Sequence, residues 1–179
     1  QALMSEFKLD GYTSFSHLDP SLPALLQEHS KASIDEKEMW RRFTEITHIK
    51  VPEYQGSLWA KYFKPELDTS VLAIMEKLKT KGHRIVCATN TEDAHYHYHL
   101  ENGQYTHFDA VYASCIIKRV KPDKDFFSYI LQAEKIEASE AFFIDDYQEN
   151  CASASELGIP NHWYTNPIDL EKQLNDIGL

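Results

Sequence analysis

Short apolar segments alternate with helix-like segments from about residue 67 to the end of the chain, and this alternation most constrains the fold. Four segments have the length and composition of β-strands: 84–89, 108–113, 141–146 and, more weakly, 162–165. Helical apolar spacing is found in the segments between and after them: 71–78, 126–133, 150–157 and 169–174. Strands and helices in this order predict parallel βαβ units with right-handed crossovers. The predicted class is therefore α/β, built on a parallel sheet.

Residues 1–66 have a different character, because they are polar, aromatic and helix-like and contain no convincing strand. Met39, Trp40 and Phe43 recur at helical spacing, and Ser33 or Asp35 is suited to cap the start of that helix. We therefore expect a small all-α region at 1–66 and an α/β core at 67–179.

Composition excludes several classes of partner. The 179 residues carry a formal net charge of −10, which argues against general affinity for nucleic acid or anionic membranes. No apolar run is long enough to span a bilayer, and no basic-then-apolar leader opens the chain. Three cysteines without a CxxC pair favour reduced thiols, so a cytoplasmic protein is expected. The sequence leaves the number of subunits open, so an oligomer is possible.

Polar residues follow the predicted strands where ligands bind in open parallel sheets, beyond the carboxyl ends. They are Thr89-Asn90-Thr91, Ser114 and the pair Asp145-Asp146, joined by Lys121 in a loop before Pro122. A phosphate dianion needs hydroxyl and amide donors and a cation, which Thr89, the amides after it and Lys121 would supply. Mg²⁺ prefers carboxylate oxygens, which Asp145 and Asp146 would supply. The pattern predicts a site for phosphate and Mg²⁺.

These residues carry a resemblance to a known superfamily. Residues 88–91, 118–123 and 142–150 resemble motifs II, III and IV of the haloacid dehalogenase (HAD) superfamily, in the right order. Residues 81–83 and 154–159 match the surroundings of motifs II and IV. The resemblance covers about residues 30–179 and is strongest to sugar-phosphate phosphatases with a small helical cap, including the glucose-1-phosphate phosphatase-like subgroup. It implies a Rossmann-like HAD core, Mg²⁺ as cofactor and a small phosphorylated metabolite as substrate.

The resemblance also implies a role for each matched residue. Thr89 would hydrogen-bond the transferring phosphoryl group, helped by the backbone of Asn90. Lys121 would neutralise phosphate charge and hold the nucleophile. Asp146 would be the principal ligand of Mg²⁺, with Asp145 assisting it directly or through water. The helical region before residue 67 would be the cap that closes over the substrate and sets its identity.

Motif I of the superfamily is not found in the chain. That motif is an apolar strand followed by Asp-x-Asp, whose first aspartate attacks phosphorus. Asp10 is the nearest match, but Lys8 stands where the nucleophile belongs and residues 1–6 are too polar for a buried central strand. We therefore interpret Asp10 as part of a surface turn.

By resemblance, the motif I strand lies between the strands at 84–89 and 141–146. Its loss would remove about four buried apolar side chains, or roughly 6–12 kcal/mol. We expect something to fill the slot: residues upstream of Gln1, a segment of this chain used unusually, or a strand from a partner. Direct hydrogen bonding between those two strands would contradict this expectation.

Two functions remain open. The first is a Mg²⁺-dependent phosphatase that acts through an aspartyl-phosphate, with its nucleophile upstream of Gln1. The second is a HAD pseudoenzyme that starts at Met4 and binds phosphate or metal in a regulatory role. In either case we expect negligible hydrolysis of p-nitrophenyl phosphate by the 179 residues. His95 and His99 have zinc-compatible spacing on a helix, but packing or contact with substrate is the favoured interpretation.

Overall fold

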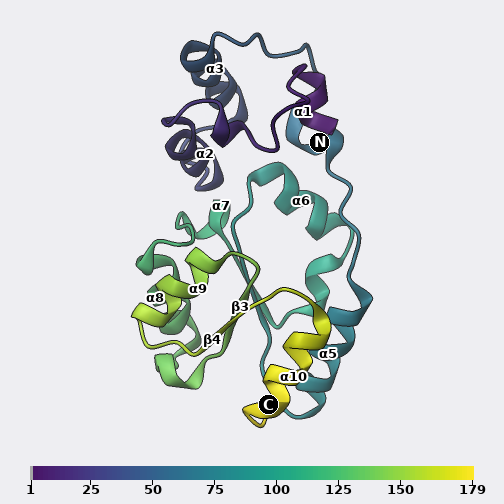
Figure 1. Cartoon of the computed structure of the whole chain (residues 1–179), viewed down its shortest axis with the longest axis vertical. Helices are drawn as coiled ribbons and strands as arrows, with labels where there is room; N and C mark the ends of the chain where they lie inside the picture. Colours follow the sequence, from purple (N-terminus) through teal and green to yellow (C-terminus); the bar gives the residue numbers. More distant parts are fainter. Residues whose placement is uncertain (1) are drawn as a thin grey trace. The chain divides into compact units, whose positions relative to one another are not determined.

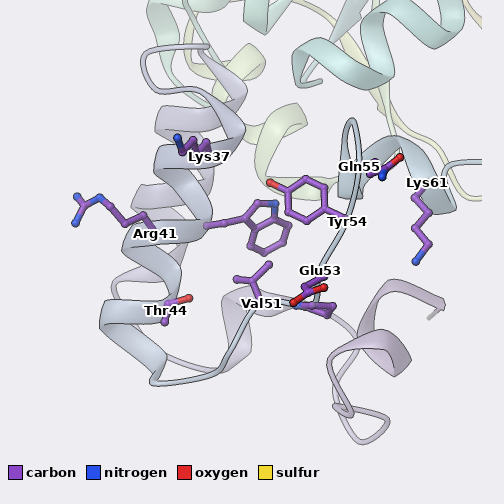
Figure 2. Close-up of a pocket in the computed structure, with 10 residues that line it drawn as sticks. Lys37, Arg41, Thr44, Val51, Glu53, Tyr54, Gln55 and Lys61 are labelled. Atoms are coloured by element: carbon purple, nitrogen blue, oxygen red, sulfur yellow. The ribbon is translucent and has the colours of Figure 1, made fainter.

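The computed structural model describes residues 2–179 (Figure 1). Its helices are α1 (Ala2–Glu6), α2 (Leu22–Ser30), α3 (Glu36–Thr47), α4 (Leu58–Tyr62), α5 (Thr69–Thr80), α6 (Asp93–Glu101), α7 (Ser114–Ile117), α8 (Lys124–Glu134), α9 (Gln148–Glu156) and α10 (Pro167–Asp176). Its strands are β1 (Val86–Thr89), β2 (Ala110–Ala113), β3 (Phe143–Asp145) and β4 (Asn161–Trp163). Short 3-10 turns occur at Phe15–His17, Gln104–His107 and Ala138–Glu140. None of the described helices combines the length and apolar character needed to cross a membrane.

The chain divides into two compact units. The first consists of the described residues up to Pro65, with Thr89–Thr106 and Ala113–Lys118. The second consists of Glu66–Ala88, His107–Tyr112 and Arg119–Leu179. The division at residues 66 and 67 that the sequence suggested stays a prediction.

An aromatic core holds the first unit together. It centres on α3, which begins after its N-cap Asp35, whose side chain accepts a hydrogen bond from the backbone of Glu38 at 2.7 Å. The predicted apolar face of this helix is confirmed, because Met39, Trp40 and Phe43 are all buried. Edge-to-face contacts join Trp40 and Phe43 to other rings, the favoured geometry for aromatic pairs.

The second unit is a layered α/β arrangement. Strands β3 and β4 are parallel, with Asp145 paired to Trp163 at their carboxyl ends. Figure 1 shows α8 and α9 on one side of these strands and α5 and α10 on the other. Apolar residues of α5 and α10, including Ile74, Leu170 and Leu174, form a buried cluster against which Ile144 of β3 packs. The predicted mixed α/β fold with parallel strands is confirmed.

The strands form two separate pairs, β1 with β2 and β3 with β4. The backbone of β3 shows which of its edges is used. Phe143 donates to the Pro160 carbonyl at 2.9 Å, and Tyr164 donates to the Asp145 carbonyl at 2.8 Å. Successive residues of a strand point their backbone groups to opposite edges. The N–H and C=O of Ile144 therefore point away from β4.

The same alternation applies to β1. Asp109, just before β2, donates its backbone N–H to the carbonyl of Ile85 at 2.8 Å. Val86 and Ala88 therefore direct their backbone groups to the edge of β1 that faces away from β2. Within residues 2–179, no described strand joins β1 to β3. Direct hydrogen bonding between β1 and β3, which would contradict a position for another strand between them, is thus not observed among the described residues. That a strand occupies this position stays a prediction.

The candidate remnant of motif I does not form a strand. Residues 7–13 form turns, and Lys8 has a left-handed backbone conformation with φ of 58°. Asp10 is exposed and its carboxylate accepts a hydrogen bond from the Ser5 hydroxyl at 2.6 Å. Both observations agree with a surface turn.

The carboxylate of Glu134, the last residue of α8, joins that helix to β2 and to the segment just before β1 in the second unit. Glu134 accepts hydrogen bonds from the Arg84 guanidinium and from the Tyr112 hydroxyl, and only 9% of its side chain is exposed. Those donors, Arg84 first, lower the pKa of Glu134 below its ordinary value of 4.5, although burial opposes them. Burial and the same carboxylate raise the pKa of Tyr112 to about 12, so the phenol remains a donor at neutral pH.

We expect Glu134→Gln to lower the free energy of unfolding at pH 7 by about 1–3 kcal/mol, because the donors Arg84 and Tyr112 lose their charged acceptor. A depressed folded-state pKa adds stability above 4.5, and that stability is lost as the pH falls through the folded value. The difference between wild type and variant should therefore shrink in acid when urea unfolding is followed at several pH values. Glu156→Gln, which removes the exposed pair with Lys124, is the control and should change the stability far less, because exposed ion pairs are screened by water. A Glu134 effect independent of pH would contradict the account.

Candidate functional site

Asp145, at the carboxyl end of β3, is a buried carboxylate whose oxygens are engaged inside the protein. Its Oδ2 accepts from Lys121 Nζ at 2.6 Å. Its Oδ1 accepts from the Tyr147 backbone at 2.8 Å and from Asn150 Nδ2 at 2.9 Å. Asn150, in the first turn of α9, thus braces this loop. Asp145 thus organises the loop between β3 and α9.

Lys121 places a buried cation between two strand ends of the second unit. Besides the bond to Asp145, its ammonium donates to the Ala88 carbonyl of β1 at 2.7 Å and lies 5.6 Å from the centre of the Phe143 ring. Only 9% of the Lys121 side chain is exposed. Ala88 directly precedes Thr89 in the chain, so the ammonium lies where motif II begins. A buried cation at strand ends is suited to neutralise an anionic ligand.

The carboxylate of Asp146 differs from that of Asp145 in its exposure and in its hydrogen bonding. Asp146 is exposed, and within residues 2–179 its carboxylate has no hydrogen-bond or ion-pair partner. Its backbone carbonyl accepts a hydrogen bond from the indole N–H of Trp163 at 3.0 Å, which ties the loop after β3 to β4. The carboxylate of Asp146 is therefore available to an external ligand.

The donor set fits part of a Mg²⁺ site. No group of three or more metal-ligating side chains gathers within the part of the chain that the structure describes. Mg²⁺ commonly retains several waters and uses one or two carboxylates together with substrate phosphate oxygens. Asp146 meets that requirement as one carboxylate. Asp145 is suited to hold Lys121 and to reach a metal only through water.

Thr89 and Asn90, the predicted phosphate-binding residues, close β1 and open the segment after it. The Thr89 hydroxyl lies 3.5 Å from the carbonyl of Asn90, a long contact that leaves it able to turn toward a ligand. Both residues belong to the first unit, whereas Lys121 and Asp145 belong to the second. Their roles toward phosphate stay predictions.

Ser114, another polar residue at a strand end, has a structural role. It is fully buried, and its hydroxyl lies 2.9 Å from the carbonyls of Ser30 and Thr91. It also accepts a hydrogen bond from the Thr91 backbone at 2.9 Å. Ser114 therefore ties α2 to the segment after β1, and its hydroxyl is fully used.

The histidines of α6 are engaged in packing. His95 Nδ1 lies 2.9 Å from the Glu92 carboxylate, and its Nε2 lies 3.3 Å from the Trp59 carbonyl. Its ring also stacks on Phe63, with centroids 3.5 Å apart. Because both ring nitrogens of His95 have partners and His99 contacts Gln104, the pair is not arranged as zinc ligands.

None of the three cysteines has the surroundings of a nucleophile. Cys115 and Cys151 are buried and Cys87 is half-buried, all as free thiols. Burial raises the pKa of Cys87 and of Cys115 to about 11, and Lys121 offsets this only in part at Cys87. These thiols therefore stay protonated at neutral pH.

Comparison with known proteins identifies the family. The family model described as haloacid dehalogenase-like hydrolase matches residues 15–163. The chain belongs to this family. The match includes every candidate site residue from Thr89 to Asp146, so the HAD motifs found in the sequence lie within the matched region.

Curated relatives of this HAD chain are longer proteins. Mouse acyl-CoA dehydrogenase family member 10 is 29% identical over 146 residues, which cover 77% of this chain and 13% of that protein. The sesquiterpene phosphatase of Aspergillus oryzae is 28% identical over 93 residues, covering 51% and 47%. Flavin mononucleotide hydrolase 1 of Arabidopsis thaliana is 32% identical over 68 residues, covering 38% and 28%. The chain thus spans less than half the length of each of these relatives.

Solved structures share the HAD fold. A predicted HAD-like family hydrolase from Porphyromonas gingivalis has a TM-score of 0.73 at 24% identity, covering 96% of this chain and 88% of its own. A HAD family enzyme from Bacteroides thetaiotaomicron, solved as a complex with magnesium and inorganic phosphate, has a TM-score of 0.66 at 24% identity, covering 91% and 85%. At this identity the likeness concerns the fold.

Trp163 and Tyr147 were not among the residues that the sequence singled out. An aromatic residue in a weak strand is usually taken for packing, so Trp163 gave no functional signal. The structure shows that Trp163 is the last residue of β4 and pairs in register with Asp145, which the sequence did not indicate.

Proposed function

We propose that the intact protein is a Mg²⁺-dependent phosphatase of small phosphorylated metabolites, and that this chain supplies its phosphate- and metal-binding groups. One observation carries the proposal. The buried ammonium of Lys121 bridges the Ala88 carbonyl and the Asp145 carboxylate, directly before the exposed and unpartnered carboxylate of Asp146. Membership of the HAD hydrolase family and a relative named as a phosphatase support it.

In the proposed chemistry each of these groups has a separate role toward the negatively charged phosphoryl group. Lys121 faces the negative charge of the phosphoryl oxygens, and the hydroxyl of Thr89 with the backbone of Asn90 donates to them. Asp145 keeps the ammonium in place, because its carboxylate holds Lys121 at 2.6 Å. Asp146 would hold Mg²⁺, which when bound neutralises charge on the transferring group.

The nucleophile in this proposal is an aspartate on a strand between β1 and β3. Its carboxylate oxygen would form a bond to phosphorus as the ester P–O bond breaks. The second aspartate of the Asp-x-Asp motif would give its proton to the leaving oxygen, so that the products are an aspartyl-phosphate and the free alcohol. Water would then cleave the aspartyl-phosphate to release inorganic phosphate. The backbone groups of Ile144 and Val86 support such a strand, because they point to the edges of β3 and β1 that β4 and β2 do not use. On the same edge of β1, the carbonyl of Ala88 already accepts a hydrogen bond from Lys121.

The other parts of the proposal follow from the same resemblance. We propose that the helical residues before 67 act as the cap over the substrate and that the protein works in the cytoplasm, with neither nucleic acid nor membrane as a partner.

A second candidate is a HAD pseudoenzyme that binds phosphate or metal without turnover. It is favoured by the turn structure of residues 7–13, which leaves the described residues without an Asp-x-Asp after a strand. In that case Lys121 and Asp146 would serve recognition alone.

The metal ligand can be tested on this chain directly. We expect Asp146→Asn to weaken Mn²⁺ binding, followed by electron paramagnetic resonance in the presence of inorganic phosphate, by roughly tenfold or more, since a direct ligand should matter at least as much as a supporting residue. Glu149→Gln, which changes an exposed carboxylate three residues away, is the matched control and should bind like wild type. Equal binding by all three proteins would remove Asp146 from the proposed metal site.

A further inference from the structure

Two large aromatic side chains are exposed next to the proposed metal ligand. Tyr147 is 65% exposed and Trp163 is 49% exposed. The other exposed aromatic residue among the described large apolar ones, Tyr12, lies in the first unit. Large aromatic side chains carry much apolar surface. Covering that surface with a ligand or a partner is more favourable than leaving it in contact with water.

The two rings are attached to the loop that presents Asp146. Trp163 donates its indole N–H to the Asp146 carbonyl at 3.0 Å, which orients the ring as well as the loop. Tyr147 follows Asp146 directly, and its backbone N–H is held by Asp145 at 2.8 Å. The indole ring of Trp163 is therefore held by its own bond to Asp146. The bond to Asp145 fixes the backbone from which the Tyr147 ring extends.

Both rings also lie where a parallel sheet binds its ligands. Trp163 is the last residue of β4 and pairs in register with Asp145, the last residue of β3. The carboxyl ends of adjacent parallel strands meet at one edge of the sheet, and ligands occupy that edge. A ligand whose phosphate lies at Asp146 would extend its organic part over one or both rings.

We propose that Trp163 and Tyr147 form an aromatic shelf that binds the organic part of the substrate, which selects phosphate monoesters of flat aromatic groups over small polyhydroxylated ones. This proposal rests on the proposed function, because it takes the phosphate to bind at Lys121 and Asp146. Stacking on an aromatic side chain is tolerant of the ligand's polar groups and needs only a flat face. The indole N–H is occupied by Asp146, so Trp163 contributes its ring face.

The shelf can be tested by binding, because we expect the 179 residues to lack turnover and to leave the probes intact. Calorimetry in Mg²⁺ would compare 1-naphthyl phosphate, glycerol phosphate and inorganic phosphate. We expect wild type to bind 1-naphthyl phosphate roughly tenfold more tightly than glycerol phosphate, with Trp163→Ala and Tyr147→Ala each losing most of that preference. Tyr12→Ala removes an exposed ring elsewhere and should keep it.

Trp163→Phe keeps a ring but loses the N–H, so it should retain most of the preference, and it serves if Trp163→Ala fails to fold. Equal affinity of wild type for the two esters, with inorganic phosphate still bound, would overturn the shelf and leave the phosphate site intact. Unchanged preference in Tyr147→Ala and Trp163→Ala would also overturn it. Failure of all three probes to bind would instead count against the proposed function, on which the shelf depends.

Discussion

Replacing Lys121 by Met should lower the free energy of unfolding by about 3–5 kcal/mol, because it leaves a buried carboxylate without its cation. The side chains of Lys121 and Asp145 are 9% and 5% exposed. A buried charge that loses its partner keeps its desolvation cost while its Coulomb attraction disappears. The bond from Lys121 to the Ala88 carbonyl is lost as well.

Lys124→Met is the matched control for this prediction. Lys124 pairs with Glu156, but their side chains are 55% and 62% exposed, so the pair should contribute far less to stability than the buried pair of Lys121 and Asp145. The double change Lys121→Met with Asp145→Asn should recover part of the loss, because it removes the unpaired charge. Urea unfolding followed by circular dichroism measures all four proteins. Equal stability of the Lys121 and Lys124 variants would show that the buried pair adds nothing.

The sequence predicted the order of elements well because periodicity and strand composition are local properties. The strands at 84–89, 108–113, 141–146 and 162–165 correspond to β1, β2, β3 and β4. The observed strands are shorter or displaced at their ends, because a strand is defined by ladder partners that a single segment does not show. The separation of the described strands into two pairs cannot be predicted from any one segment, because it depends on which strands pair in the folded protein.

The sequence placed Lys121 and Asp145 near the ends of strands, and in the structure their side chains lie 2.6 Å apart. Their roles toward a ligand stay predictions. Which carboxylate is free could not be read from adjacent aspartates. That depends on the turn in which Tyr147 and Asn150 donate to Asp145 and leave Asp146 exposed.

The aromatic shelf was not predicted, since exposure is a tertiary property. Trp163 occupies a strand position that would be buried if another element covered it. Among the described residues it remains half exposed, and the bond from its indole to the Asp146 carbonyl is the observation that links it to the candidate site.

Supplying the missing strand should have the largest effect on activity, because it adds the reacting group itself. The extension would be an apolar strand of about five residues, typical of globular proteins, followed by Asp-x-Asp and fused upstream of the chain. Its backbone would bond to the edges at Ile144 and Ala88, so slower amide exchange at Ile144 would report that the slot is filled. The amide of Phe143, which already bonds to Pro160, is the internal control.

The decisive measurement is the hydrolysis of p-nitrophenyl phosphate with Mg²⁺ by three proteins: the 179-residue chain, the strand-extended chain, and the strand-extended chain with Asp146→Asn. The account predicts negligible turnover by the first, clear turnover by the second, and loss of that turnover in the third. Turnover by the 179-residue chain that Asp146→Asn abolishes would contradict the need for an added nucleophile. An extended chain that is inert although Ile144 is protected and Mn²⁺ is bound would contradict the phosphatase and favour the pseudoenzyme.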